Sequence, residues 1–153
     1  MKKIGVIFTY TWICLFSIQG ITAPESQLTI NILDQKKSGV IYLTICRDAI
    51  GFENSVENES DENSCRTVSI SSEAKEILEV TADIPDGDYA IALFVDSNGN
   101  NKIDKNFIGI PKEQYGFSND AMGQMKGPSY EQAKFIVSGD TTHNITLKSG
   151  ISR

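Results

Sequence analysis

Several classes of protein need residues that this chain of 153 residues has in short supply. It has one histidine and three cysteines, so the usual nitrogen and sulfur ligands of zinc are scarce. Basic residues number 14 against 20 acidic ones, and a net charge of −6 argues against a general nucleic-acid binder. No Gly-x-Ser-x-Gly motif accompanies the single histidine, so no serine-hydrolase triad is indicated.

Long apolar runs are also scarce, and the main one lies at the N-terminus. Lys2 and Lys3 precede an almost wholly apolar segment, residues 4–18, and Ala23 follows shortly afterwards. This layout is typical of a secretory signal peptide, and the segment is shorter than the roughly 20 residues of a spanning helix. An N-terminal anchor helix is the alternative. We therefore predict a signal peptide over residues 1–23 and a single periplasmic or extracellular domain over 24–153, with no membrane span after cleavage.

Removing the signal peptide leaves two cysteines. Cys14 lies inside the apolar segment, whereas Cys46 and Cys65 belong to the mature chain. Disulfides persist outside the cytoplasm, and two cysteines allow one pairing. We expect a Cys46–Cys65 disulfide.

Alternation of apolar and polar residues dominates the mature chain. A period of two predicts strands with one face on a core. The segment 89–95 is apolar throughout, which favours a central strand covered on both faces, and Ser129 with Gln132 predicts one short helix start. The fold expected is an all-β, immunoglobulin- or transthyretin-like antiparallel sandwich of about seven strands, with a barrel as the alternative. The predicted strands are 28–32, 41–45, 67–70, 78–84, 89–95, 135–137 and 145–147.

Two long segments lack this alternation. Residues 96–127 contain glycines, asparagines and aromatics, and loops of this length in compact domains usually carry function. We expect any functional site to lie there. Residues 48–64 are rich in Glu, Asn and Ser, and we expect a solvated acidic loop.

The start of the first segment resembles a calcium-binding loop of EF-hand type. Counting from Asp96, oxygen-bearing residues occupy positions 1, 3, 5 and 9, and position 7 supplies a backbone carbonyl. Position 6 is Asn101, which tolerates the positive φ needed there, but position 12 is Phe107 instead of a bidentate glutamate. A polar turn held by Asx hydrogen bonds is the alternative. The predicted metal ligands are Asp96, Asn98, Asn100, Lys102 and Asp104.

Aromatic side chains in and after the loop are candidates for ligand contact. Phe107, Tyr115, Phe117 and Tyr130 could form a sugar-stacking platform or an apolar pocket, or a satellite core beneath the loop. The satellite core predicts that the first three are mostly buried. His143 shares a strand face with buried residues and is expected at the edge of the core, not at a catalytic site.

Three dissimilar motifs in order carry a family resemblance. The segments 84–90, 92–104 and 106–119 resemble the exported bacterial domain-of-unknown-function family 2141 over about residues 28–147. The resemblance implies a secreted β-sandwich without an established activity, and some members have a cysteine pair placed like Cys46 and Cys65. Asn101 departs from the glycine that similar sequences often have.

These observations support two functional hypotheses. The first is an exported, non-catalytic binding or structural module, with calcium bracing the loop and a glycan or protein as partner. The second is a small secreted enzyme, for example one acting on glycans, with the 96–127 loop as its active site.

Overall fold

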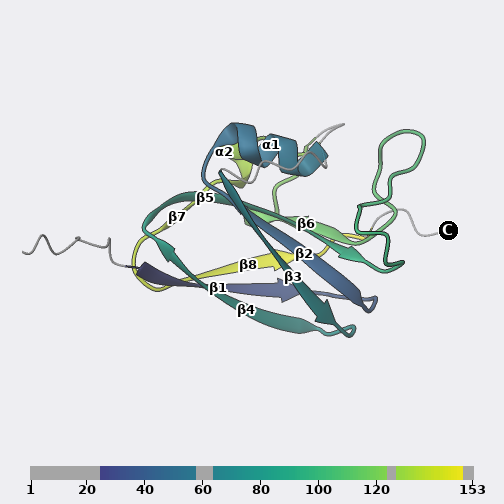
Figure 1. Cartoon of the computed structure of the whole chain (residues 1–153), viewed down its shortest axis with the longest axis horizontal. Helices are drawn as coiled ribbons and strands as arrows, with labels where there is room; N and C mark the ends of the chain where they lie inside the picture. Colours follow the sequence, from purple (N-terminus) through teal and green to yellow (C-terminus); the bar gives the residue numbers. More distant parts are fainter. Residues whose placement is uncertain (1–24, 58–63, 124–126, 150–153) are drawn as a thin grey trace, which may run out of the picture.

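The computed structural model describes residues 25–57, 64–123 and 127–149, in which eight strands, two α-helices and one 3₁₀ helix form (Figure 1). The predicted signal peptide lies outside the described residues and stays a prediction. No helix among the described residues is long and apolar enough to cross a membrane. The elements are β1 (Glu25–Leu33), β2 (Gly39–Cys46), α1 (Ala49–Glu57), β3 (Cys65–Ser72), β4 (Ile77–Pro85), β5 (Gly87–Asp96), β6 (Tyr115–Phe117), η1 (Ser118–Asp120), α2 (Tyr130–Ala133), β7 (Phe135–Val137) and β8 (Thr141–Thr146).

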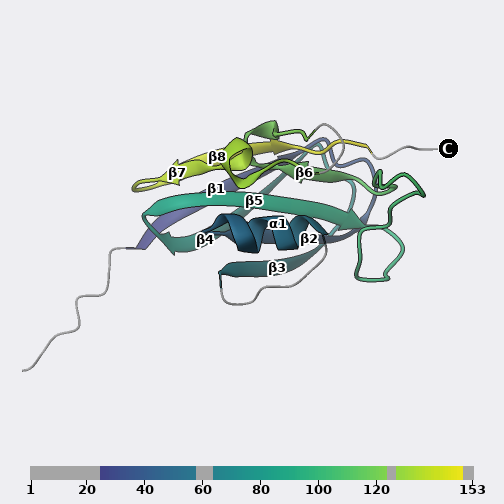
Figure 2. The ribbon, with the colours of Figure 1, turned by 90° about the horizontal axis from the view of Figure 1, so that it is seen from above.

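Two sheets make up the sandwich (Figures 1 and 2). One has the strand order β4-β1-β8 and the other β3-β2-β5-β6, with β7 pairing to the start of β5. The expected all-β sandwich is confirmed, but one strand pair differs from the antiparallel expectation. Because the turn after β7 carries the chain from β5 to the other sheet, β8 begins beside Leu28 and runs parallel to β1.

The main core lies between the sheets and follows from the period of two. Successive inward residues of β1, β2 and β5 are fully or almost fully buried. β5 is buried on both faces, as the apolar segment 89–95 predicts: Ile91 and Leu93 face the core, while Ala90 and Ala92 belong to a second cluster on the outer face.

Both helices cover that second cluster (Figure 1). The prediction of a solvated loop over 48–64 is wrong for its first part, because residues 49–57 form α1; residues 58–63 lie outside the described residues. Asp48 caps the helix by accepting the Gly51 N–H at 2.8 Å, and Phe52 is fully buried. Helix α2 has the capping box expected from Ser129 and Gln132.

All seven predicted strands form, and β6 is an additional one. Its three residues, Tyr115–Phe117, are too few to show a period of two. Gly116 lets this strand approach β8 closely, since a Cβ atom there would lie 2.8 Å from the Ile145 side chain. The strand fixes the end of the long loop to the sheet.

Candidate functional site

The segment between β5 and β6 extends beyond one end of the sandwich (Figures 1 and 2). It has two structured parts. The first is an Asx-rich turn over residues 96–104, and the second is a short hairpin over residues 105–111, closed by a bridge between Lys105 and Pro111.

Asp96 organises the first part. Its side chain is 2% exposed, and its carboxylate accepts hydrogen bonds from four successive backbone N–H groups. The shortest come from Gly99 at 2.7 Å and Asn101 at 2.8 Å. Burial raises the pKa of Asp96, but the four donors together outweigh burial and hold the pKa below its usual value. Asn101 has φ 62°, the positive value expected at this position.

Two other residues of the predicted calcium site, Asn98 and Asn100, converge on Asp104, whereas Lys102 donates its backbone N–H to the Asn100 side chain at 2.9 Å. The side-chain amides of Asn98 and Asn100 donate to the Asp104 carboxylate at 2.6 and 3.2 Å. These amides present donor groups, whereas a cation would need their oxygens. Within the described residues, no group of three or more His, Cys, Asp or Glu side chains could hold a metal. The turn is thus held by Asx hydrogen bonds, and calcium stays a prediction.

Glu113 is a buried acid that the sequence motif did not include. Its carboxylate accepts the Ser97 N–H at 2.9 Å and the Asp104 N–H at 3.3 Å, so it ties both ends of the turn together. Glu113 comes after the hairpin, beyond the last ligand position of an EF-hand loop that starts at Asp96. No signal in the sequence pointed to it.

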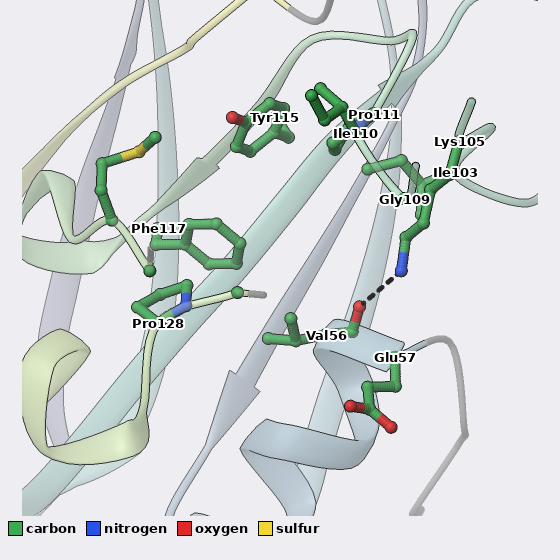
Figure 3. Close-up of a pocket in the computed structure, with 13 residues that line it drawn as sticks. Val56, Glu57, Ile103, Lys105, Gly109, Ile110, Pro111, Tyr115, Phe117 and Pro128 are labelled. Carbon is green, nitrogen blue, oxygen red and sulfur yellow. Dashed lines mark hydrogen bonds between the residues drawn. The ribbon is translucent and has the colours of Figure 1, made fainter. Parts of the chain in front are cut away.

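A pocket of about 560 Å³ lies between the end of α1, the hairpin and β6 (Figure 3). Tyr115 and Phe117 are half-buried, and their rings meet edge to face at 5.8 Å. Two of the four predicted contact aromatics therefore line one pocket. The lining residues are Val56, Glu57, Ile103, Lys105, Gly109, Ile110, Pro111, Tyr115, Phe117, Met122, Gly123, Gly127 and Pro128.

The other two predicted contact aromatics lie elsewhere. The expectation that Phe107 is buried is wrong: it is 98% exposed, because it occupies the hairpin turn, where Asn106 already satisfies the backbone. Tyr130 is buried beneath α1, where its hydroxyl donates to the Arg47 carbonyl at 2.9 Å. Burial raises the pKa of Tyr130.

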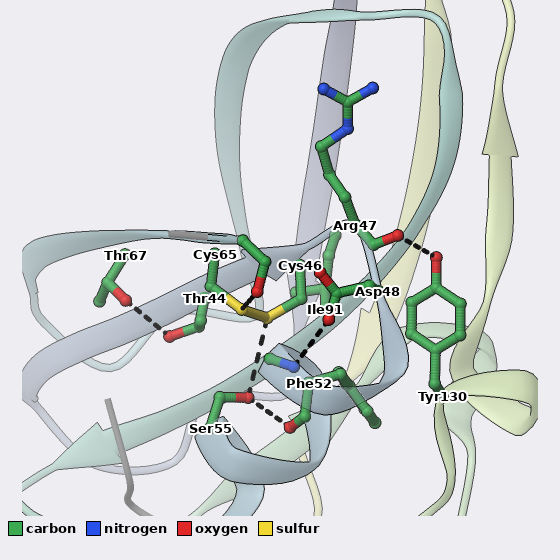
Figure 4. The surroundings of a disulfide bond; sticks show 12 residues. Thr44, Cys46, Arg47, Asp48, Phe52, Ser55, Cys65, Thr67, Ile91 and Tyr130 are labelled. Atoms are coloured by element: carbon green, nitrogen blue, oxygen red, sulfur yellow. Dashed lines mark hydrogen bonds between the residues drawn. A yellow bond between two sulfur atoms is a disulfide. The ribbon is translucent and has the colours of Figure 1, made fainter. Parts of the chain in front are cut away.

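Helix α1 supplies the pocket wall that the sequence did not predict. The Cys46–Cys65 disulfide joins the strands that flank this helix, as expected, and Ser55 lies beside Cys46 (Figure 4). Phe52 meets Phe117 edge to face at 6.3 Å, so the helix packs against the pocket floor. Asp48 as N-cap, followed by apolar residues four apart at Phe52 and Val56, was the available signal.

Among the described lining residues, Lys105 and Glu57 carry charge. The Lys105 ammonium donates to the Val56 carbonyl at 3.4 Å, where α1 ends (Figure 3). A cation at a helix C-terminus is favoured by the helix dipole. The contact also links the hairpin to α1 across the pocket.

His143 lies at the edge of the core, as predicted. It stacks on Phe135 with ring centroids 4.1 Å apart, and its Nε2 accepts the Asn119 N–H at 3.1 Å. Burial lowers the pKa of His143, and Asp120 opposes this in part. Asn119 and Asp120 both have positive φ, so this contact stabilises a strained turn just before the pocket residue Met122.

These features define a small two-sheet β-sandwich domain with a pocket beside the loop at one end. The chain belongs to DUF2141, a family described as an uncharacterised protein conserved in bacteria, whose model matches residues 18–146. The resemblance noted in the sequence is therefore confirmed. Neither the curated proteins nor the solved structures provide a match.

Proposed function

We propose that this protein is an exported, non-catalytic binding module that holds a small, partly apolar molecule in the pocket beside β6. The observation that carries the proposal is the pocket itself. Its volume of about 560 Å³ lies within the roughly 300–1,000 Å³ of small-molecule sites, and most of its lining residues have no polar side-chain group. Export of the module rests on the predicted signal peptide.

The elements around the pocket are suited to holding a preformed shape. The floor belongs to a strand of the sheet, one wall is held by the disulfide, and the hairpin is closed by backbone hydrogen bonds. A site that is ordered before binding loses less entropy when the ligand arrives.

The chemistry of the lining indicates the type of ligand. The rings of Tyr115 and Phe117 offer apolar surface to a flat or ring-shaped group, including the apolar face of a sugar (Figure 3). Lys105 can donate to an anionic or carbonyl oxygen at the pocket rim. A ligand with an apolar ring and one acidic or carbonyl group fits this lining best.

Anilinonaphthalene sulfonate has this combination and serves as the probe. We expect its fluorescence to rise on binding one site per chain, and Ile110→Arg to weaken the binding at least tenfold, because a long charged side chain would enter the pocket. Ile136→Arg is the matched control: Ile136 is 69% exposed on β7 and does not line the pocket. Equal loss of binding in both variants, or in neither, would contradict the proposal.

Calcium bracing of the Asx-rich turn is a separate proposal. The positive φ of Asn101 and the convergence of Asn98 and Asn100 on Asp104 support it. A bound cation would need the two amide oxygens to turn towards it, in exchange for the hydrogen bonds that these oxygens accept from the Asn100 and Lys102 N–H groups. The absent bidentate acid predicts a dissociation constant of about 10⁻⁴ to 10⁻³ M.

A melt in excess calcium against chelator tests the bracing. Calcium at ten times the dissociation constant should stabilise the fold by about 1.4 kcal/mol, and magnesium should do less. Asp104→Asn should abolish the shift. If calcium leaves both the melt and the amide NMR signals of residues 96–104 unchanged, the turn binds no calcium.

The enzyme hypothesis predicts a different result from the same pocket. Hydrolysis of a glycan would need two positioned acids or another acid–base pair. Glu57 is the one carboxylate among the described lining residues. The enzyme hypothesis therefore needs a second acid from a residue outside this lining. Release of reducing sugar from a mixed polysaccharide panel, lost in Glu57→Gln, would favour the enzyme.

A further inference from the structure

The tip of the 105–111 hairpin displays apolar side chains that nothing in the described structure covers. Phe107 is 98% and Ile108 59% exposed, and the two occupy the central positions of the turn. Central turn positions usually carry polar residues or glycine, because they face water. An aromatic and a β-branched residue there expose apolar surface without contributing to the core.

The hairpin itself is well determined by hydrogen bonds. Asn106 accepts the N–H groups of Ile108 and Ile110 through its side chain, at 3.0 and 2.9 Å. Its backbone accepts the Gly109 N–H and donates to the Ile110 carbonyl. Gly109 has φ 82°, which completes the turn. The turn therefore holds Phe107 and Ile108 outward without relying on contacts of their own.

The segment 102–112, which contains the tip, has a net charge of the opposite sign from the chain as a whole. Lys102, Lys105 and Lys112 are all exposed, whereas the chain has a net charge of −6. Asp104 is the one acid within residues 102–112, and its carboxylate accepts the two asparagine amides. Lys105 and Lys112 stand at the base of the hairpin, next to the bridge that closes it.

We propose that this tip is a peripheral docking surface for an anionic lipid membrane. Apolar side chains of interfacial elements enter the boundary between headgroups and acyl chains by about 5–10 Å, and lysines remain at the level of the headgroups. The hairpin has the same arrangement, with Phe107 and Ile108 at its tip and Lys105 and Lys112 at its base. The charge of the lysines selects lipid phosphates over a neutral surface.

The location of the hairpin permits this docking. The loop segment extends beyond the end of the sandwich in both views, so a flat surface can reach it (Figures 1 and 2). The pocket is lined by the base of the same hairpin, but Phe107 and Ile108 are not part of its lining. The docking surface and the pocket can therefore be tested with separate substitutions.

A single indole at the tip provides a local test. The chain has one tryptophan, Trp12, so the full chain with Trp12→Phe and Phe107→Trp carries its only indole at the turn. We expect its emission to shift to shorter wavelength with vesicles of equal phosphatidylglycerol and phosphatidylcholine, and to be quenched by lipids brominated near the headgroup. Phosphatidylcholine vesicles should give little change. Lys102→Gln and Lys112→Gln should each lower the partition coefficient about fivefold.

The matched control places the indole at the other end of the molecule. Trp12→Phe with Ile136→Trp carries it on β7, which pairs with the start of β5, whereas the hairpin follows the end of β5. Residues 1–23 are alike in both chains, so vesicle binding through them leaves the contrast between the two indoles intact. The control emission should stay unchanged.

Four results would overturn the proposal. Anionic vesicles could leave the emission of the tip indole unchanged, or shift both indoles equally. If the emission of the tip indole shifts without lipid, and the shift grows with protein concentration, the surface binds a second copy of the chain instead of a membrane. If Phe107→Ser abolishes binding of a protein partner, and vesicles leave the emission of the tip indole unchanged, the tip is a protein-binding surface.

Discussion

Replacement of Asp96 by alanine should destabilise the fold more than any other change in the loop. The Asp96 carboxylate is the common acceptor of the N–H groups of residues 98–101, at 2.7 to 3.3 Å, and it is 2% exposed. Asp96→Ala would leave four donors without this acceptor. The turn also positions Asp104 and Glu113, so its loss should loosen the base of the hairpin.

The size of this destabilisation follows from the number of hydrogen bonds to the Asp96 carboxylate and from their exposure to water. An unsatisfied buried donor costs about 1–3 kcal/mol, but residues 98–101 are themselves exposed, so water can replace part of the carboxylate. About 3 kcal/mol for the four bonds together is the expected loss of unfolding free energy. For a chain of this length, the melting temperature should fall by about 6–12 °C. Asp96→Asn retains one acceptor oxygen and should lose about half as much.

Thermal melts as a function of pH test both the size of the destabilisation by Asp96→Ala and its cause. Because the folded pKa of Asp96 is lowered, its contribution is fully present above the unfolded value of about 3.9 and is lost as the pH falls through the folded pKa. The gap between wild type and Asp96→Ala should therefore be constant at neutral pH and shrink below about pH 4. Asp83→Ala, at an exposed position of β4, controls for the lost charge. A melting temperature of Asp96→Ala within about 1 °C of wild type at neutral pH would refute the reasoning.

Three further predictions concern the rest of the chain. Titration of denatured, unreduced protein should find no thiol at Cys46 or Cys65, and replacing both by serine should lower stability by about 3 kcal/mol through the loop they close. Burial lowers the pKa of His143, and its neutral Nε2 accepts a backbone N–H, so the folded state favours the neutral ring. The free energy of unfolding should therefore decline as the pH falls from about 6.5 towards the folded pKa. Thermal melts at several pH values should show that His143→Gln removes this dependence. Intact-mass measurement of protein from the native host should show residues 1–23 removed; a mass that includes them would disprove the signal peptide.

Much of the fold followed from alternation alone. Strands such as β1 and β2 bury every second residue, and this period is visible in strands of about five or more residues that bury one face. The parallel pairing of β8 with β1 could not be predicted, because it depends on which sheet the chain enters after the turn at residues 138–140. The short strand β6 is held by its contact with β8 and has no period of its own.

The site was predictable in location but not in composition. A long segment with glycines and aromatics indicated residues 96–127, and Tyr115 and Phe117 do line the pocket. Hydrophobicity alone placed Phe107 in a core, although the turn signal of Asn106 and Gly109 would have placed it at a tip. The wall from α1 was missed because acidic composition concealed the spacing of Phe52 and Val56.

Methyl NMR during a titration with anilinonaphthalene sulfonate tests the central claim most directly. If the pocket is the binding site, the methyl signals of Ile103, Ile110 and Met122 should shift together and saturate with one probe per chain. The methyl signals of Ile30 and Leu43, which are buried in the core between the two sheets, should stay in place. Shifts centred on these core residues, or no saturable shift at Ile103, Ile110 and Met122, would contradict the account.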